Sequence, residues 1–195
     1  MKNYLVQCLF VFLFFNLSVR AVFAFEEEHQ AHEHGHATLM LVQEKAELQL
    51  VFKSPAMNII GFEHQANSPE QHAKIAWAKQ SLSNAAELFL ITQSAQCVLE
   101  HVHISSSLLS KDEDGDKHES HGEDEHDEHK ADDKGSHSEF EAEYHFECAS
   151  ISELKEIKLA LFETFKSIEE LETHVITSSG QKLLELDPKN VSIRF

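Results

Sequence analysis

Alternating apolar and polar residues predict that much of this chain forms β-sheet. Residues 38–42 and 47–52 alternate on either side of a short polar connection, which predicts a hairpin whose second strand ends at Pro55. From Phe140 to Cys148, apolar residues alternate with glutamates and one histidine, so this strand should have one buried and one polar face. Further strands are expected at about 95–106, at 171–177, from a turn at 178–181 to about 186, and at 191–195.

Two segments carry apolar residues at helical spacing instead. Ser68, Pro69 and Gln71 are the residue types of a helix N-terminus, and the apolar stripe behind them predicts a helix from residue 69 to about 88. A second helix should follow the similar start at 150–153, with its apolar stripe at Leu154, Ile157, Leu161 and Phe165. Together these elements predict an α+β fold with a mostly antiparallel sheet and two amphipathic helices.

A long insertion separates the strands at 95–106 and 140–148. Residues 111–137 contain no Leu, Ile or Val and no aromatic residue. Such a segment cannot bury enough apolar surface to offset the entropy lost on ordering. We therefore expect a disordered His-, Asp- and Glu-rich loop at 110–137 within a single domain at 37–195.

The N-terminus has the features of a secretory signal peptide. Lys2 precedes an apolar run from Tyr4 to Leu17, and a small-residue cleavage pattern ends at Ala24, after which we expect cleavage. A membrane anchor is the alternative, but the apolar run is shorter than the roughly 20 residues that span a bilayer. The mature chain should therefore be exported without stable membrane insertion, and residues 25–36 should form a mobile arm.

The charge of the chain excludes some classes of partner. The formal net charge is −18, and removal of residues 1–24 takes away Lys2 and Arg20 but no acid, which gives −20. Nucleic acids and anionic membranes attract basic proteins, so neither is an expected partner. A mature chain of this charge should attract cations.

Cleavage also removes Cys8 and leaves Cys97 and Cys148 as an even pair. In an exported chain such a pair is expected to form a disulfide. A pair of thiolate metal ligands is the alternative, although neither cysteine belongs to a CxxC motif. The bridge would join the two strands on either side of the insertion.

Histidine is concentrated in two tracts, in the arm and in the insertion. They contain His29, His32, His34 and His36, and His118, His121, His126, His129 and His137. Neutral imidazole with carboxylate suits zinc, with nickel and copper as competitors. We interpret both tracts as metal contacts rather than as charged linkers alone, and expect several exchanging sites there.

Residues His32–His36 read HEHGH and so satisfy HExxH, the signature of zinc proteases. That motif requires a helix, whereas this segment contains Gly35 and precedes a strand. We therefore expect no enzyme, and a zinc-dependent hydrolase stays as an alternative that a helix here would favour. The acidic run at residues 112–116 lacks the glycine at position six and the distal glutamate of an EF-hand loop, so calcium is not expected.

The folded part offers candidate ligands with more fixed geometry. Glu63 and His64 lie in the connection before the first helix, and His72 lies in the first turn of that helix. Side chains beside a helix start are held better than those of a mobile tract. We expect His64, with other histidines, to form a rigid site that holds the ion.

A second group of candidates lies on the strands beside the cysteines: His101, His103 and His145. Strict pairing of Cys97 opposite Cys148 would place His101 opposite Tyr144, on the other face from His145. A cluster of these histidines therefore requires a β-bulge. His174 is expected to be a packing or surface residue.

The sequence resembles the ZrgA-like periplasmic zinc-uptake accessory proteins. The resemblance rests on HEHGH before the first strand, SPAMNIIGFEH before a helix, AQCVLE, the His/Asp/Glu-rich loop and YHFEC, and it covers the mature chain. It implies a zinc-binding protein of the periplasm that works beside an ABC-type zinc importer or its binding protein. It also implies the pair Glu63–His64 and the tract histidines as metal contacts. A resistance buffer for nickel or copper is the other alternative.

Overall fold

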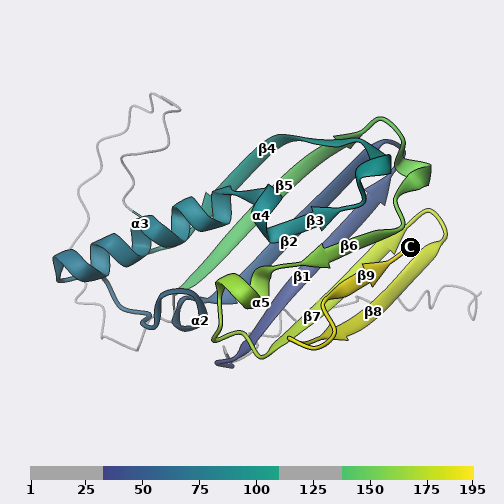
Figure 1. The fold of residues 1–195 in the computed structure, drawn as a ribbon. Coiled ribbons are helices and arrows are strands. Elements are labelled where there is room, and N and C mark those ends of the chain that lie inside the picture. Colours follow the sequence, from purple (N-terminus) through teal and green to yellow (C-terminus); the bar gives the residue numbers. More distant parts are fainter. Residues whose placement is uncertain (1–32, 110–137) are drawn as a thin grey trace, which may run out of the picture. The chain divides into compact units, whose positions relative to one another are not determined.

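The structure is a computed structural model that describes residues 33–109 and 138–195. Its larger sheet contains, in spatial order, β4 (Cys97–Ser105), β5 (Glu139–Cys148), β2 (Glu47–Pro55), β1 (His36–Glu44), β7 (Glu170–Thr177) and β8 (Gly180–Leu186) (Figure 1). Neighbouring strands are antiparallel except β1 and β7, which are parallel. The predicted α+β fold with a mostly antiparallel sheet is confirmed.

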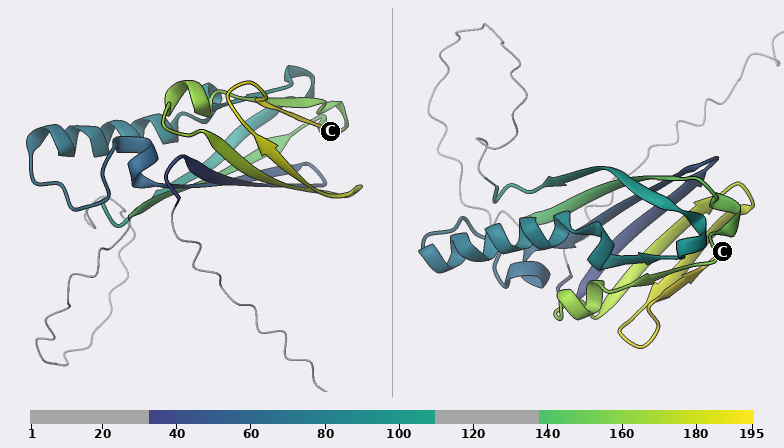
Figure 2. Two further views of the ribbon diagram at one scale, coloured as in Figure 1. Left: turned by 90° about the horizontal axis from the view of Figure 1, so that it is seen from below. Right: turned by 45° about the horizontal axis from the view of Figure 1, so that its top comes forward.

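A smaller sheet and the helices form a second layer. The sheet has the order β3 (Phe89–Ile91), β6 (Glu156–Leu159) and β9 (Ser192–Arg194). The described helices are α2 (Ala56–Ile60), α3 (Pro69–Ser83), α4 (Ala85–Leu88) and α5 (Leu161–Thr164), with 3-10 turns η1 (Gln93–Ala95) and η2 (Ile151–Glu153). Figure 2 shows α3, α5 and the smaller sheet on the same side of the larger sheet.

The core lies between these two layers and is built from alternate residues of the central strands. Leu39, Leu50 and Tyr144 are completely buried, one each on β1, β2 and β5. The Tyr144 ring packs edge-on against Phe89, with 5.0 Å between ring centroids, and its hydroxyl donates to the Leu82 carbonyl at 2.7 Å. The opposite side chains of the same strands form an outer face that is largely polar.

Most of the expected strands are confirmed. The hairpin appears as β1 and β2, and β5 buries Phe140, Ala142, Tyr144, Phe146 and Cys148 while its glutamates and His145 face outward. The start of α3 is also confirmed, because the Ser68 hydroxyl accepts from the Gln71 amide at 3.3 Å. The strands at 171–177, 180–186 and 192–194 are present as β7, β8 and β9.

Two expectations about helices are wrong. The helix that starts at Pro69 ends at Ser83, and after Asn84 the chain forms the short α4 and then β3. The second amphipathic helix is absent, because residues 156–159 form β6 between β3 and β9. In β6 the buried residues Ile157 and Leu159 are two positions apart, which is the spacing of a strand face, and Leu161 begins the short helix α5.

The expected disulfide joins Cys97 to Cys148 at the start of β4 and the end of β5. Beyond the bridge the register of β4 shifts between Leu99 and His101, as in a β-bulge. The shift places His101 opposite His145 and His103 opposite Glu143. The bulge that a cluster of these histidines requires is therefore present.

The signal peptide, residues 25–32 of the arm and the insertion at 110–137 lie outside the described residues. In the part that is described, no helix is both long enough and apolar enough to cross a membrane.

Candidate metal centre

Both histidine-rich tracts join the described fold at the same end of the larger sheet. β1 begins there, and β2 ends there beside the start of β5, with Pro55 opposite Glu139. β4 also ends there, with Ser105 opposite Glu141. Residue 33 and residues 109 and 138, which border the two tracts, are therefore attached to one end of the sheet.

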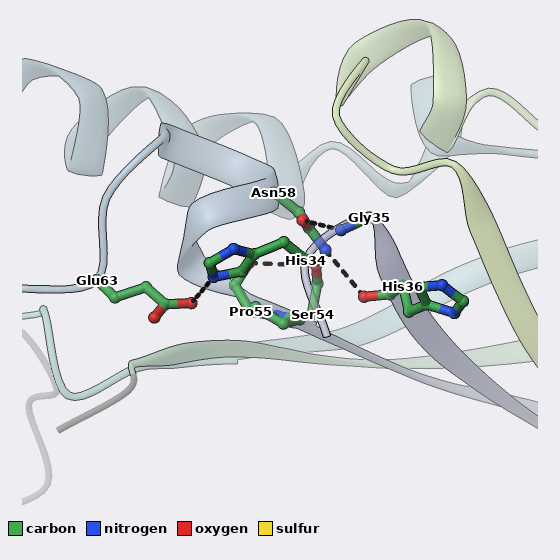
Figure 3. Close-up of polar contacts among 7 residues, drawn as sticks. All are labelled: His34, Gly35, His36, Ser54, Pro55, Asn58 and Glu63. Atoms are coloured by element: carbon green, nitrogen blue, oxygen red, sulfur yellow. Dashed lines mark hydrogen bonds and ion pairs between the residues drawn. The ribbon is translucent and has the colours of Figure 1, made fainter. Parts of the chain in front are cut away.

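Asn58 holds the first described residues of the arm against this end of the sheet. It lies in α2, directly after β2, and is only 3% exposed. Its side-chain oxygen accepts from the Gly35 amide at 2.8 Å, and its side-chain nitrogen donates to the His36 carbonyl at 2.8 Å and to the Ser54 hydroxyl at 3.2 Å (Figure 3). One buried amide thus fixes the backbone on both sides of the 35–36 peptide.

The other side of the Gly35 peptide is held by the chain that leads into β7. The Gly35 carbonyl accepts from the amides of Glu169 at 2.7 Å and Glu170 at 3.1 Å. Gly35 has a φ of 90°, in the region that favours glycine, so a side chain at this position would strain the turn. The backbone that carries His34 and His36 is therefore held in place by hydrogen bonds on both sides of Gly35.

His34 points toward Glu63 (Figure 3). The distance from His34 Nε2 to Glu63 Oε1 is 3.3 Å, and the two side chains are 53% and 12% exposed. Glu63 follows Gly61, which ends α2 in the left-handed conformation with a φ of 83° and turns the chain back. An imidazole and a nearly buried carboxylate from two distant segments thus meet at the end of the sheet.

His64, the next residue, is exposed and has a defined orientation. Its ring stacks on Phe62 with 5.1 Å between centroids, and its Nδ1 lies 2.9 Å from the Gln65 carbonyl oxygen. When Nδ1–H donates to that oxygen, Nε2 carries the lone pair that binds a metal. Gln65 in turn donates to the Ser107 carbonyl at 3.0 Å, which ties this connection to the chain that leads into the insertion.

The remaining candidates are spread over the fold. His36 lies beside Glu33 and Glu170 at 3.7 and 3.8 Å and points away from His34 in Figure 3. His72 is exposed in the first turns of α3. His101 and His145 face each other across β4 and β5, with 6.1 Å between ring centroids.

Outside the described residues lie His29, His32, His118, His121, His126, His129 and His137. Among the residues that the structure does describe, no three His, Cys, Asp or Glu side chains are close enough in their present conformations to hold one ion. Glu33–His36 of the HExxH motif form a turn and the first residue of β1, not a helix.

Sequence reasoning missed Asn58 and the role of Gly35. The available signal was a single polar residue in the apolar segment AMNII, since a buried amide is tolerated only where its hydrogen bonds are made. The periodicity of the segment does not reveal which distant backbone groups that amide contacts.

The described chain is thus an α+β domain with imidazole–carboxylate pairs at one end of its larger sheet. Residues 31–195 match the ZrgA family of zinc uptake proteins, and the chain belongs to that family. The suspected resemblance is therefore confirmed, and the family assigns the protein a role in zinc uptake. Comparison with the curated proteins found no match.

Proposed function

We propose that this protein captures zinc in the periplasm and supports its uptake by an ABC-type importer. The histidine- and acid-rich tracts raise the local concentration of the ion, and a site at the end of the sheet holds it for transfer. The role in capture rests on the family, the charge and the chemistry of the side chains that meet at that end.

The pair His34–Glu63 is the observation that carries this proposal. Two donor atoms on one tetrahedral zinc, each about 2.05 Å from the ion, are separated by about 3.3 Å. His34 Nε2 and Glu63 Oε1 are 3.3 Å apart, the separation of two neighbouring ligands. The pair can accept an ion with little rearrangement, and Asn58 holds the backbone beside it in place.

A two-residue pair is not a complete zinc site, which ordinarily has four ligands. We propose that His64 and further histidines complete the site, while the histidines of the insertion collect the ion at lower affinity. Residues 33, 109 and 138, which border the two tracts, lie at this end of the sheet. His72, in the first turns of α3, is a further candidate of this group.

Calorimetric titration of the mature chain with zinc tests the site. Glu63→Gln should lower the affinity of the tightest site at least about tenfold, since it replaces a charged ligand by a neutral amide. The matched control is Glu172→Gln, which removes a carboxylate that also lies beside a histidine, His174, at 2.8 Å. Equal effects of the two substitutions would overturn the assignment of His34 and Glu63.

The same titration at acid pH tests the dependence on imidazole. A histidine must be neutral to bind zinc, so affinity should fall as the pH is lowered through the ordinary titration range of histidine, about 6.5. Equal affinity at neutral and acid pH would contradict a histidine site. Parallel titrations with nickel and copper distinguish zinc capture from a resistance buffer.

Support of the importer is tested in cells. Deletion of the gene should lower zinc accumulation in zinc-poor medium, and the intact protein should restore it better than Glu63→Gln. If both proteins restored zinc accumulation to the same level, uptake would not depend on the site at Glu63.

A further inference from the structure

The outer face of β4 and β5 carries a second group of potential ligands, far along the strands from His34. His101 and His103 are two residues apart on β4, so both side chains leave the same face. His145 is opposite His101 on β5, and Glu143 is opposite His103. The four residues occupy the corners of one rectangle on the sheet.

The bulge in β4 creates this rectangle. Upstream, the disulfide fixes Cys97 opposite Cys148 and Leu99 opposite Phe146. If that register continued, His101 would lie opposite Tyr144, on the core side. The shift after Leu99 moves His101 and His103 to the outer face, beside His145. Bulges of this kind re-aim side chains, often at functional sites.

We propose that His101, His103 and His145 form a second zinc site, with a fourth position taken by Glu143 or water. Three imidazoles from two neighbouring strands, with an open fourth position, suit tetrahedral zinc. The site is distinct from the pair at His34. Along β5, His145 is six residues from Glu139 at the end of the sheet, or about 20 Å at about 3.4 Å per residue.

The spacing of the backbone allows one ion to reach all three rings. Opposite residues of antiparallel strands have Cβ atoms about 5 Å apart, and residues two apart on one strand are separated by about 6.8 Å. An ion above the centre of that rectangle is then about 4 Å, measured in the plane of the sheet, from each corner. An imidazole Nε2 extends far enough from its Cβ to bind there.

The rings need only a small adjustment. Two imidazoles on one tetrahedral zinc have centroids about 5 Å apart, whereas those of His101 and His145 are 6.1 Å apart. The three side chains are too far apart in their present rotamers to hold one ion. His101 and His103 are exposed and His145 is half-buried, so rotation about their side-chain bonds meets little packing.

The surroundings favour a cation at this position. β5 presents Glu141, Glu143 and Glu147 on the same face. Lys53, on β2, pairs with Glu141 at 2.5 Å, and this hydrogen bond raises the pKa of Lys53. Lys53 is thus engaged by Glu141, two residues from Glu143 along β5, and Glu143 lies directly across from His103.

The test compares single substitutions in the mature chain by equilibrium dialysis with zinc and by absorption of bound Co²⁺. His101→Gln and His145→Gln should each remove one bound equivalent, with affinity lowered at least about 100-fold, since loss of even an outer-shell partner costs 10- to 100-fold. Both should also lose the visible bands of one tetrahedral Co²⁺. His174→Gln, on the same outer face, should change neither readout.

Variant Glu63→Gln separates this site from the one at the end of the sheet. The Glu63→Gln protein should still bind the zinc ion that the His101→Gln protein loses, whatever its effect on zinc binding at the end of the sheet. If His101→Gln and His145→Gln bind as many ions as His174→Gln, with the same Co²⁺ spectrum, the site on the outer face is refuted. Thermal unfolding of each metal-free variant shows whether the fold is intact.

Discussion

Substitution of Asn58 by alanine should release the arm from the sheet without destroying the fold. The change removes the 2.8 Å bonds to the Gly35 amide and the His36 carbonyl, and the 3.2 Å bond to Ser54. Each hydrogen bond contributes about 1 kcal/mol net, and a buried group left without a partner costs about 1–3 kcal/mol. We expect a loss of about 2–4 kcal/mol in the free energy of unfolding.

The effect on zinc should exceed what a general loss of stability would cause. Once the arm is released, binding through His34 must order its backbone again, at about 1–2 kcal/mol for each residue fixed. If two residues are released, the cost is at least about 2 kcal/mol, which corresponds to roughly a 30-fold lower affinity.

Three measurements on the Asn58→Ala protein check this reasoning. Urea denaturation gives the stability, competition with a chromophoric chelator gives the zinc affinity, and hydrogen exchange reports the Gly35 amide directly. Ser54→Ala is the control, because it removes one bond and keeps both contacts from Asn58 to the backbone. A destabilised Asn58→Ala protein whose Gly35 amide stays protected and whose zinc affinity is unchanged would refute the argument.

Three further predictions concern the fold and the insertion. Replacing Cys97 and Cys148 by alanine should cost about 4 kcal/mol by the chain-entropy estimate for a 51-residue separation, and reductant should no longer change the urea midpoint. Burial raises the pKa of Tyr144 above its ordinary value, so its contribution to stability is complete below about pH 10 and is lost at higher pH, as the unfolded chain ionises. Tyr144→Phe should cost about 1 kcal/mol at pH 7, through the bond to Leu82, and should flatten the fall in stability above pH 10 in urea titrations. Deletion of residues 111–137 should leave the thermal midpoint within a few degrees and remove only the low-affinity zinc equivalents in calorimetry; loss of all binding would place the site in the insertion.

The strands could be predicted where one face is buried and the other is solvated. In β5 every second residue from Phe140 to Cys148 is buried, so the pattern and the structure coincide. Residues 154–165 are predicted to form one helix, but they contain the strand β6, which pairs with β3 and β9, and only the short helix α5. That pairing joins segments far apart in the sequence, which periodicity does not record.

At the candidate site, too, the residue types could be predicted from the sequence, but the contacts between distant segments could not. Residue types alone suggested Glu63 and His34, since both lie in recognisable histidine- and acid-bearing motifs. Their mutual contact depends on Asn58 and on the turn at Gly35, both set by tertiary hydrogen bonds. The bulge in β4 could be stated only as a requirement, because the sequence near Leu99 contains no glycine that would mark it.

The parallel pairing of β1 with β7 has a consequence for how the protein folds. β1 pairs with β2, the next strand in the chain, but it also pairs with a strand that begins at Glu170, 134 residues after His36. Until that strand is available, the centre of the larger sheet has an unpaired edge, which is prone to non-native association. During synthesis from the N-terminus, the turn at Gly35 therefore gains its contacts with Glu169 and Glu170 only after those residues have been made, and truncations before residue 177 should be aggregation-prone rather than merely less stable.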